Sequence, residues 1–123
     1  MQLNHLNLSV QDVPATRALF ETYFDFTCTD PKPNDALSVL KGPDNFVLVL
    51  MHQRFNEKGN HTYPDAFHIG FYLDSQAAVN QMHERLLQGG IPATQAPQFM
   101  RKTYGFYFSF DTFLIEVTTP VND

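Results

Sequence analysis

The sequence predicts an α+β fold built from a unit that occurs twice, in which a strand and a helix precede three further strands. Three observations carry this expectation. Residues 3–10 and 66–73 each alternate apolar and polar side chains, as strands with one buried face do. Each alternating segment is followed by a helical apolar stripe, and each stripe by segments typical of a hairpin. We expect one domain, 1–123, with module one at about 1–53 and module two at about 65–120.

The first module opens with the strand 3–10. Asp12 is expected to cap the helix that follows, because its carboxylate can accept hydrogen bonds from unpaired backbone N–H groups. The apolar stripe of this helix consists of Leu19, Phe20, Tyr23 and Phe24. A short strand at 26–29 and a hairpin of strands 36–40 and 46–51 complete the module.

The second module repeats this order after the polar, turn-rich stretch 53–64, which indicates a linker or a flexible lid. Its strand 66–73 precedes a helix that Asp74 or Ser75 can cap and that the Gly-Gly pair 89–90 ends. The stripe of this helix consists of Ala78, Val79, Met82, Leu86 and Leu87. A segment between Pro92 and Pro97 and the strands 106–110 and 113–118 follow.

The two modules also match residue by residue. A shift of 68 − 5 = 63 places His5 on His68, and it lays the apolar residues of the first strand on those of 66–73. A shift of 116 − 49 = 67 places Val49 on Glu116 in the hairpin. An internal repeat of this length implies pseudo-twofold symmetry in the fold.

Composition excludes several function classes. Eight Lys and Arg against 13 Asp and Glu give a net charge of −5, which makes the chain a poor ligand for nucleic acid or for acidic membranes. The single cysteine, Cys28, has no partner for an internal disulfide, and metal sites built from paired cysteines are excluded. No apolar run approaches the length of about 18 residues that a membrane span needs, and the N-terminus lacks a signal-peptide pattern. We expect a soluble, cytoplasmic protein.

Three side chains could together carry chemistry. Strand alternation turns His5, His68 and Glu116 away from the helix of their own module. Two imidazoles and one carboxylate are the ligand set that binds a divalent transition metal and leaves positions open. The sequence therefore suggests a metal site wherever these three faces line one surface.

Each of these residues also has a structural interpretation. His5 can be a half-exposed strand residue, and His68 a core histidine bonded to a backbone carbonyl. Glu116 can pair with Arg54, Arg101 or Lys102. The matched places of the two histidines in the repeat favour the metal interpretation.

Three segments resemble the vicinal oxygen chelate superfamily: NHLNLSVQDVPATRALFETYFDF, FHIGFYLDS and FYFSFDTFLIEV. This superfamily includes glyoxalase I, bleomycin-resistance proteins, fosfomycin-thiol transferases, methylmalonyl-CoA epimerase and extradiol dioxygenases. The resemblance implies two tandem βαβββ modules that form a curved, cup-shaped mixed sheet. It also implies one divalent metal ion (Fe, Mn, Zn, Ni or Mg), with ligands that match His5, His68 and Glu116.

The chain departs from individual members of the family. Glyoxalase I has a fourth ligand, a glutamate, where this chain has Val49 or Leu48, so true glyoxalase I activity is not expected. Fosfomycin-thiol transferases usually have threonine where this chain has Asn7, and a basic residue beyond the last ligand strand.

The function expected from the resemblance is that of a metal-dependent enzyme acting on a small oxygen-chelating substrate, of the glyoxalase-like lyase, thiol transferase or dioxygenase type. The alternative is a metal-free binding protein of the bleomycin-resistance kind, and a third reading is a scaffold with a vestigial site. The expected partners are a small-molecule substrate and a second copy in a homodimer, with no nucleic acid and no membrane. Candidates for the substrate pocket are Asn7, Tyr72, Tyr104 and Arg101. Residues available for other supporting roles are His52, His61, Tyr63 and Tyr107, and no catalytic acid or base is assigned. Strand alternation places His52 on the face of Leu48 and Leu50, which favours an outward or helix-side position over a catalytic one.

Overall fold

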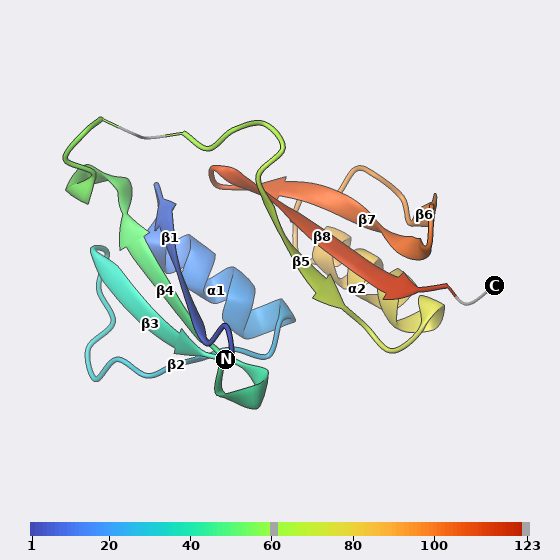
Figure 1. The fold of residues 1–123 in the computed structure, drawn as a ribbon, viewed down its shortest axis with the longest axis horizontal. Coiled ribbons are helices and arrows are strands. Elements are labelled where there is room, and N and C mark those ends of the chain that lie inside the picture. The colour runs from blue at the N-terminus through green and yellow to red at the C-terminus, as the bar shows by residue number, and fades with distance from the viewer. Residues whose placement is uncertain (60–61, 122–123) are drawn as a thin grey trace. The chain divides into compact units, whose positions relative to one another are not determined.

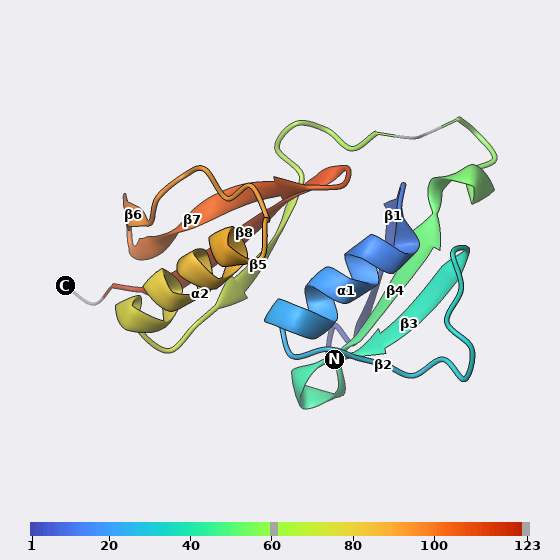
Figure 2. The same ribbon diagram turned by 180° about the vertical axis from the view of Figure 1, so that it is seen from behind.

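The computed structural model describes residues 1–59 and 62–121. The chain divides into two compact units, Met1–Tyr63 and Pro64–Asp123, and Figure 1 shows the elements of each. Each unit contains one helix, which covers one face of a four-stranded sheet, as Figure 2 shows from the other side. Neither helix of the described residues is both long and apolar enough to cross a membrane.

The first unit contains a mixed sheet with the strand order β1-β4-β3-β2. Its elements are β1 (His5–Val10), α1 (Val13–Tyr23), β2 (Thr27–Cys28), β3 (Leu37–Lys41) and β4 (Val47–His52). Two short 3-10 helices, Pro43–Asn45 and Gln53–Phe55, flank β4. Strand β1 runs parallel to β4, and the other neighbours are antiparallel.

The second unit has the equivalent strand order, β5-β8-β7-β6. Its elements are β5 (His68–Tyr72), α2 (Gln76–Gln88), β6 (Gln98–Met100), β7 (Thr103–Phe110) and β8 (Phe113–Pro120). Again the first strand of the unit, β5, runs parallel to the last, β8. The predicted α+β fold with two βαβββ modules is thus confirmed.

Both helices begin at the side chains that helix capping requires. Asp12 accepts a hydrogen bond from the backbone N–H of Ala15 at 2.9 Å. Of the two candidates at the second helix, Ser75 is the cap and accepts from the N–H of Ala78 at 3.1 Å. Each cap satisfies one of the N–H groups that the first helical turn leaves unpaired.

The core of each unit lies between the helix and one face of the sheet. The buried side chains of the second unit include Val79, Leu86, Phe106, Ile115 and Val117. Leu87, which we expected in the stripe of α2, is instead 48% exposed. An α-helix turns by about 100° per residue, so Leu87 lies at the side of the helix when Leu86 points toward the sheet.

The structure also shifts some strand boundaries. Strand β5 begins at His68 rather than at 66, because the preceding residues form a turn in which the Phe67 N–H donates to the Pro64 carbonyl at 3.0 Å. Strand β6 lies after Pro97 and has only three residues. A segment of three residues is too short for alternation to be recognised in the sequence.

The register of the parallel strand pairs confirms the internal repeat. In the first unit Asn7 lies beside Val49, and in the second Gly70 lies beside Glu116. The shifts of 63 and 67 therefore hold in the hydrogen-bonded sheets as they do in the sequence. Val49 occupies the position in the first unit that Glu116 occupies in the second.

Candidate functional site

His68 and Glu116 come together on the face of the second sheet that α2 does not cover. The His68 Nε2 and Glu116 Oε1 atoms lie 4.0 Å apart, and the side chains are 40% and 23% exposed. His68 Nδ1 lies 2.9 Å from the Ala66 carbonyl oxygen. Because a carbonyl can only accept, Nδ1 carries the proton of the neutral imidazole, and Nε2 has the lone pair. The turn that precedes β5 thereby fixes both the tautomer and the ring orientation.

Tyr107 contacts both members of this pair. It is the register neighbour of Glu116 on β7, and its hydroxyl donates a hydrogen bond to the Glu116 carboxylate. This hydrogen bond, with burial and the carboxylate charge as smaller causes, raises the pKa of Tyr107 above its usual value of 10.0. The Tyr107 ring also packs edge-on against the His68 ring, with centroids 5.5 Å apart. Tyr107 therefore limits the positions that both side chains can adopt.

Gly70 leaves space on the other side of Glu116. It is the register neighbour of Glu116 on β5, and a Cβ atom at this position would lie 3.2 Å from Glu116 Oε1. Such a contact is tighter than ordinary van der Waals packing, so the carboxylate would have to move. The absence of a side chain at Gly70 keeps the carboxylate in its observed position.

A cavity of about 840 Å³ lies in the second unit next to this group. The residues that line it are Met100, Arg101, Lys102, Thr103, Tyr107 and Glu116. Its volume lies within the range of about 300–1,000 Å³ that is typical of small-molecule sites. Of the four predicted pocket residues, Arg101 is thus brought to the same cavity as Glu116.

Tyr72 and Tyr104 lie on opposite faces of the second sheet. Tyr72 shares the face of His68 by strand alternation, and it is 74% exposed. The Tyr104 hydroxyl donates to Asn80 Oδ1 on α2 at 2.7 Å. Tyr104 therefore lies on the helix side, and the structure does not bring it to Glu116.

His5 and Asn7 lie in the first unit, both exposed on β1. They share one face of that strand, and Val49 on β4 is the neighbour of Asn7 on the same face. His5 Nδ1 lies 2.7 Å from the Asn4 Oδ1 atom. His5 thus occupies the strand position that His68 occupies in the second unit.

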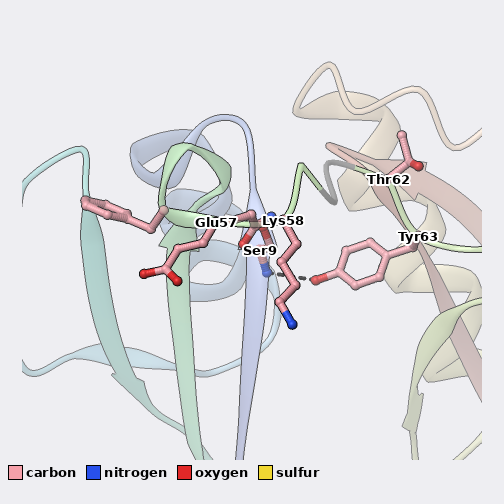
Figure 3. A pocket seen from close by; sticks show the side chains of 7 residues that line it. Ser9, Glu57, Lys58, Thr62 and Tyr63 are labelled. Carbon is pink, nitrogen blue, oxygen red and sulfur yellow. Dashed lines mark hydrogen bonds between the residues drawn. The ribbon is translucent and has the colours of Figure 1, made fainter.

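The other candidate residues of the first unit have local roles. His52 Nδ1 accepts a hydrogen bond from the Arg54 N–H at 3.0 Å. The Tyr63 hydroxyl accepts from the Ser9 N–H at 2.7 Å, beside a cavity of about 500 Å³ shown in Figure 3. His61 lies outside the described residues.

The residues of the second unit fit a divalent metal ion. Two ligands that are each about 2.1 Å from one ion lie about 3.0–3.4 Å apart at octahedral or tetrahedral angles, so His68 Nε2 and Glu116 Oε1, which are 4.0 Å apart, must approach each other by about 0.6–1.0 Å to share an ion. The hydrogen bond from Nδ1 to a backbone carbonyl is the usual second interaction of a metal-binding histidine. Neither unit gathers three His, Cys, Asp or Glu side chains in the part of the chain that the structure describes.

Comparison with known protein families identifies the chain. The model of the Glyoxalase/Bleomycin resistance protein/Dioxygenase superfamily matches residues 2–120, which is nearly the whole sequence. The chain belongs to this superfamily. The resemblance expected from the sequence is thereby confirmed. Search of the curated proteins found no match.

Several solved structures have a similar fold. A structure described as a possible glyoxalase from Bacillus cereus is 32% identical, with a TM-score of 0.72, and the match covers 95% of this chain and 97% of that one. A lactoylglutathione lyase from Agrobacterium tumefaciens is 20% identical, with a TM-score of 0.73 and coverage of 96% and 92%. The fosfomycin resistance protein FosX from Listeria monocytogenes is 18% identical, with a TM-score of 0.75 and coverage of 98% and 94%. At these low identities the last two show the likeness of fold alone.

Proposed function

We propose that this member of the superfamily is a metal-dependent enzyme that acts on a small oxygen-chelating substrate. The observation that carries the proposal is the His68–Glu116 pair, with donor atoms 4.0 Å apart and the remaining His68 nitrogen held by a backbone carbonyl. His5 is the proposed third ligand, because it holds the equivalent strand position in the first unit. The reaction is of the glyoxalase-like lyase, thiol transferase or dioxygenase type.

The residues around the pair would prepare it for this task. The Ala66 carbonyl keeps the lone pair of His68 on Nε2, and Tyr107 restrains the Glu116 carboxylate by a hydrogen bond. A divalent ion, when bound, supplies a Lewis acid with open positions for two neighbouring substrate oxygens. A single carboxylate among the protein ligands neutralises only part of its charge, which favours an anionic oxygen on the substrate.

True glyoxalase I activity is not part of this proposal. Val49 stands at the position equivalent to Glu116, and a valine side chain can neither bind a metal nor transfer a proton. Leu48, the other position considered for a fourth ligand, is buried on the helix side of its sheet. We expect negligible isomerisation of the adduct of methylglyoxal and glutathione.

Metal analysis tests the proposed ligands directly. Protein purified without chelator should contain about one divalent ion per chain, as a three-ligand site of this type requires. His68→Ala and Glu116→Ala should lose it, and His5→Ala should weaken binding strongly. His52→Gln is the matched control, because its ring nitrogen is engaged with the Arg54 N–H. A folded wild-type protein without metal, even after incubation with Zn²⁺, Ni²⁺ or Mn²⁺, would contradict the proposal and favour the metal-free binding protein.

We further propose that the protein forms a homodimer. In each unit the sheet has one face that its own helix leaves uncovered (Figure 2). On the second unit this face carries the exposed ring of Tyr72. In a dimer with twofold symmetry the same face of both chains meets at one interface, so each chain covers the exposed sheet face of the other. Sedimentation velocity at micromolar concentration should give the mass of two chains; a monomer with intact metal binding would refute the dimer and leave the metal site standing.

A further inference from the structure

We infer that Arg101 and Lys102 form an anion-binding subsite in the cavity next to Glu116. The molecule that binds there is therefore a small compound with an ionised oxyacid group, such as a carboxylate or a phosphonate. The inference rests on the proposed function only for the statement that this compound is the substrate of the metal site.

The positive charge of the second unit is concentrated at this cavity. Residues 64–123 contain three basic side chains, Arg85, Arg101 and Lys102, in a chain whose net charge is −5. Two of the three line the same cavity. Within the described residues, no hydrogen bond or ion pair engages the side chain of Arg101 or of Lys102. Two adjacent cations without partners in an acidic protein are available for an anion from solution.

The backbone conformation at Arg101 also suggests that its side chain has a functional role. The structure describes five residues other than glycine with positive φ: Asp25, Asp44, Asn45, Arg101 and Asp111. Four of them are Asp or Asn, the types that tolerate the left-handed conformation best, whereas Arg101 has φ 43° with a long side chain. Glycine or asparagine would adopt this backbone conformation with less strain. The presence of an arginine that destabilises the turn therefore suggests a functional role for its side chain.

The turn that carries both cations is firmly attached to the sheet. Met100 and Thr103 pair across β6 and β7, and Thr103 Oγ1 donates to the Met100 carbonyl at 3.1 Å. The Val121 N–H donates to the Lys102 carbonyl at 2.8 Å. The backbone of the two cations is thus fixed relative to β7 and β8, which supply Tyr107 and Glu116 to the same cavity.

The cavity is consequently polarised. Glu116 contributes negative charge at one part of its lining, and the Tyr107 hydroxyl is already engaged with that carboxylate. Arg101 and Lys102 contribute the positive charge. An anionic group is repelled by Glu116 and attracted by the two cations, so it is oriented toward the β6–β7 turn. The rest of the same molecule then lies toward Glu116 and His68, where the proposed chelation takes place.

Binding of a simple anion to the chelator-treated full chain tests the subsite without any metal. The probes are methylphosphonate and, as its neutral counterpart, dimethyl methylphosphonate, titrated with NMR detection at low ionic strength. The wild-type chain should bind the anion and not the ester. Arg101→Asn, which suits the left-handed backbone, and Lys102→Gln should each raise the Kd for methylphosphonate about tenfold. Arg85→Gln removes the same charge from α2, away from the cavity, and should leave the Kd unchanged.

Each other outcome decides the question. An unchanged Kd in both cavity variants, an equal loss in Arg85→Gln, or equal binding of the ester would overturn the subsite. The spectra also report folding, and Lys102→Gln carries the test alone should Arg101→Asn fail to fold. Metal content measured on the same variants should equal that of the wild type. Wild-type protein that binds the anion selectively but holds no metal would refute the proposed function and not the subsite.

Discussion

Substitution of Gly70 separates the stability of the second unit from the integrity of its site. A Cβ at this position would lie 3.2 Å from Glu116 Oε1, so in Gly70→Ala the carboxylate must move by a few tenths of an ångström. Alanine also has a conformational advantage over glycine inside a strand, of about 0.5–1 kcal/mol. Gly70→Val adds two more carbons beside the same carboxylate and fits a strand well.

The expected effects follow from these distances. Functional groups at a site must be held to within about 0.5 Å, and disturbing the interactions that orient metal ligands typically costs 10–100-fold in affinity. We expect Gly70→Ala to weaken Zn²⁺ binding about threefold to tenfold and Gly70→Val about 100-fold. The free energy of unfolding without metal should be unchanged or slightly higher in Gly70→Ala, because the conformational advantage of alanine in a strand opposes the cost of moving the Glu116 carboxylate.

Calorimetric titration with Zn²⁺ and urea unfolding of the metal-free protein measure the two quantities independently. Gln98→Val is a suitable control, because it places a similar side chain on β6, which β7 separates from the strand of Glu116. A folded Gly70→Val variant with the wild-type affinity for Zn²⁺ would refute the assignment of Glu116 as a ligand in its observed position. Equal losses in Gly70→Val and Gln98→Val would show that the effect is not local to the carboxylate.

Three further predictions concern single side chains. Val49→Glu should tighten Zn²⁺ binding at least tenfold in a calorimetric titration, because it places a carboxylate at the position equivalent to Glu116; unchanged affinity would contradict a role of this first-unit position in the proposed metal site. Tyr107→Phe should lower the free energy of unfolding by about 1 kcal/mol at neutral pH, as judged by urea unfolding. The folded pKa of Tyr107 is raised above 10.0, so this contribution is complete below pH 10 and is lost as the pH rises through the folded pKa. The difference in the free energy of unfolding between wild type and Tyr107→Phe should therefore shrink in alkali. Asp12→Ala should cost about 1 kcal/mol in the same assay through the loss of the helix cap, with unchanged metal content; no change in stability would show that the cap bond at Ala15 is unimportant.

The sequence predicted the fold well because its signals are local and periodic. Alternation in the strands and the capping residues Asp12 and Ser75 depend on neighbours only a few positions away. The internal repeat also predicted a relation between distant residues, the equivalence of Val49 and Glu116, and the strand registers confirm it. The three-residue strand β6 carried too few positions for any periodicity.

The surroundings of Glu116 could not be predicted in the same way. The sequence contains five tyrosines, and only the pairing of β7 with β8 shows that Tyr107 lies beside the carboxylate. Tyr104, three residues away, points to the opposite side of the sheet and bonds to Asn80. The role of Gly70 depends on the absence of a side chain, which no motif records, although the register expected from the repeat could have indicated it.

The parallel pairing of the first and last strands of a unit has a consequence for how the site comes into existence during folding. His68 and Glu116 are separated by 116 − 68 = 48 residues, so their contact has a high sequence separation within a unit of 60 residues. Contacts of this kind form after local hairpins, because the entropy of closing the intervening loop has to be overcome first. During synthesis the pair cannot assemble until β8 has left the ribosome. A ligand that bridges His68 and Glu116 would then join the two ends of the folding unit and slow its opening.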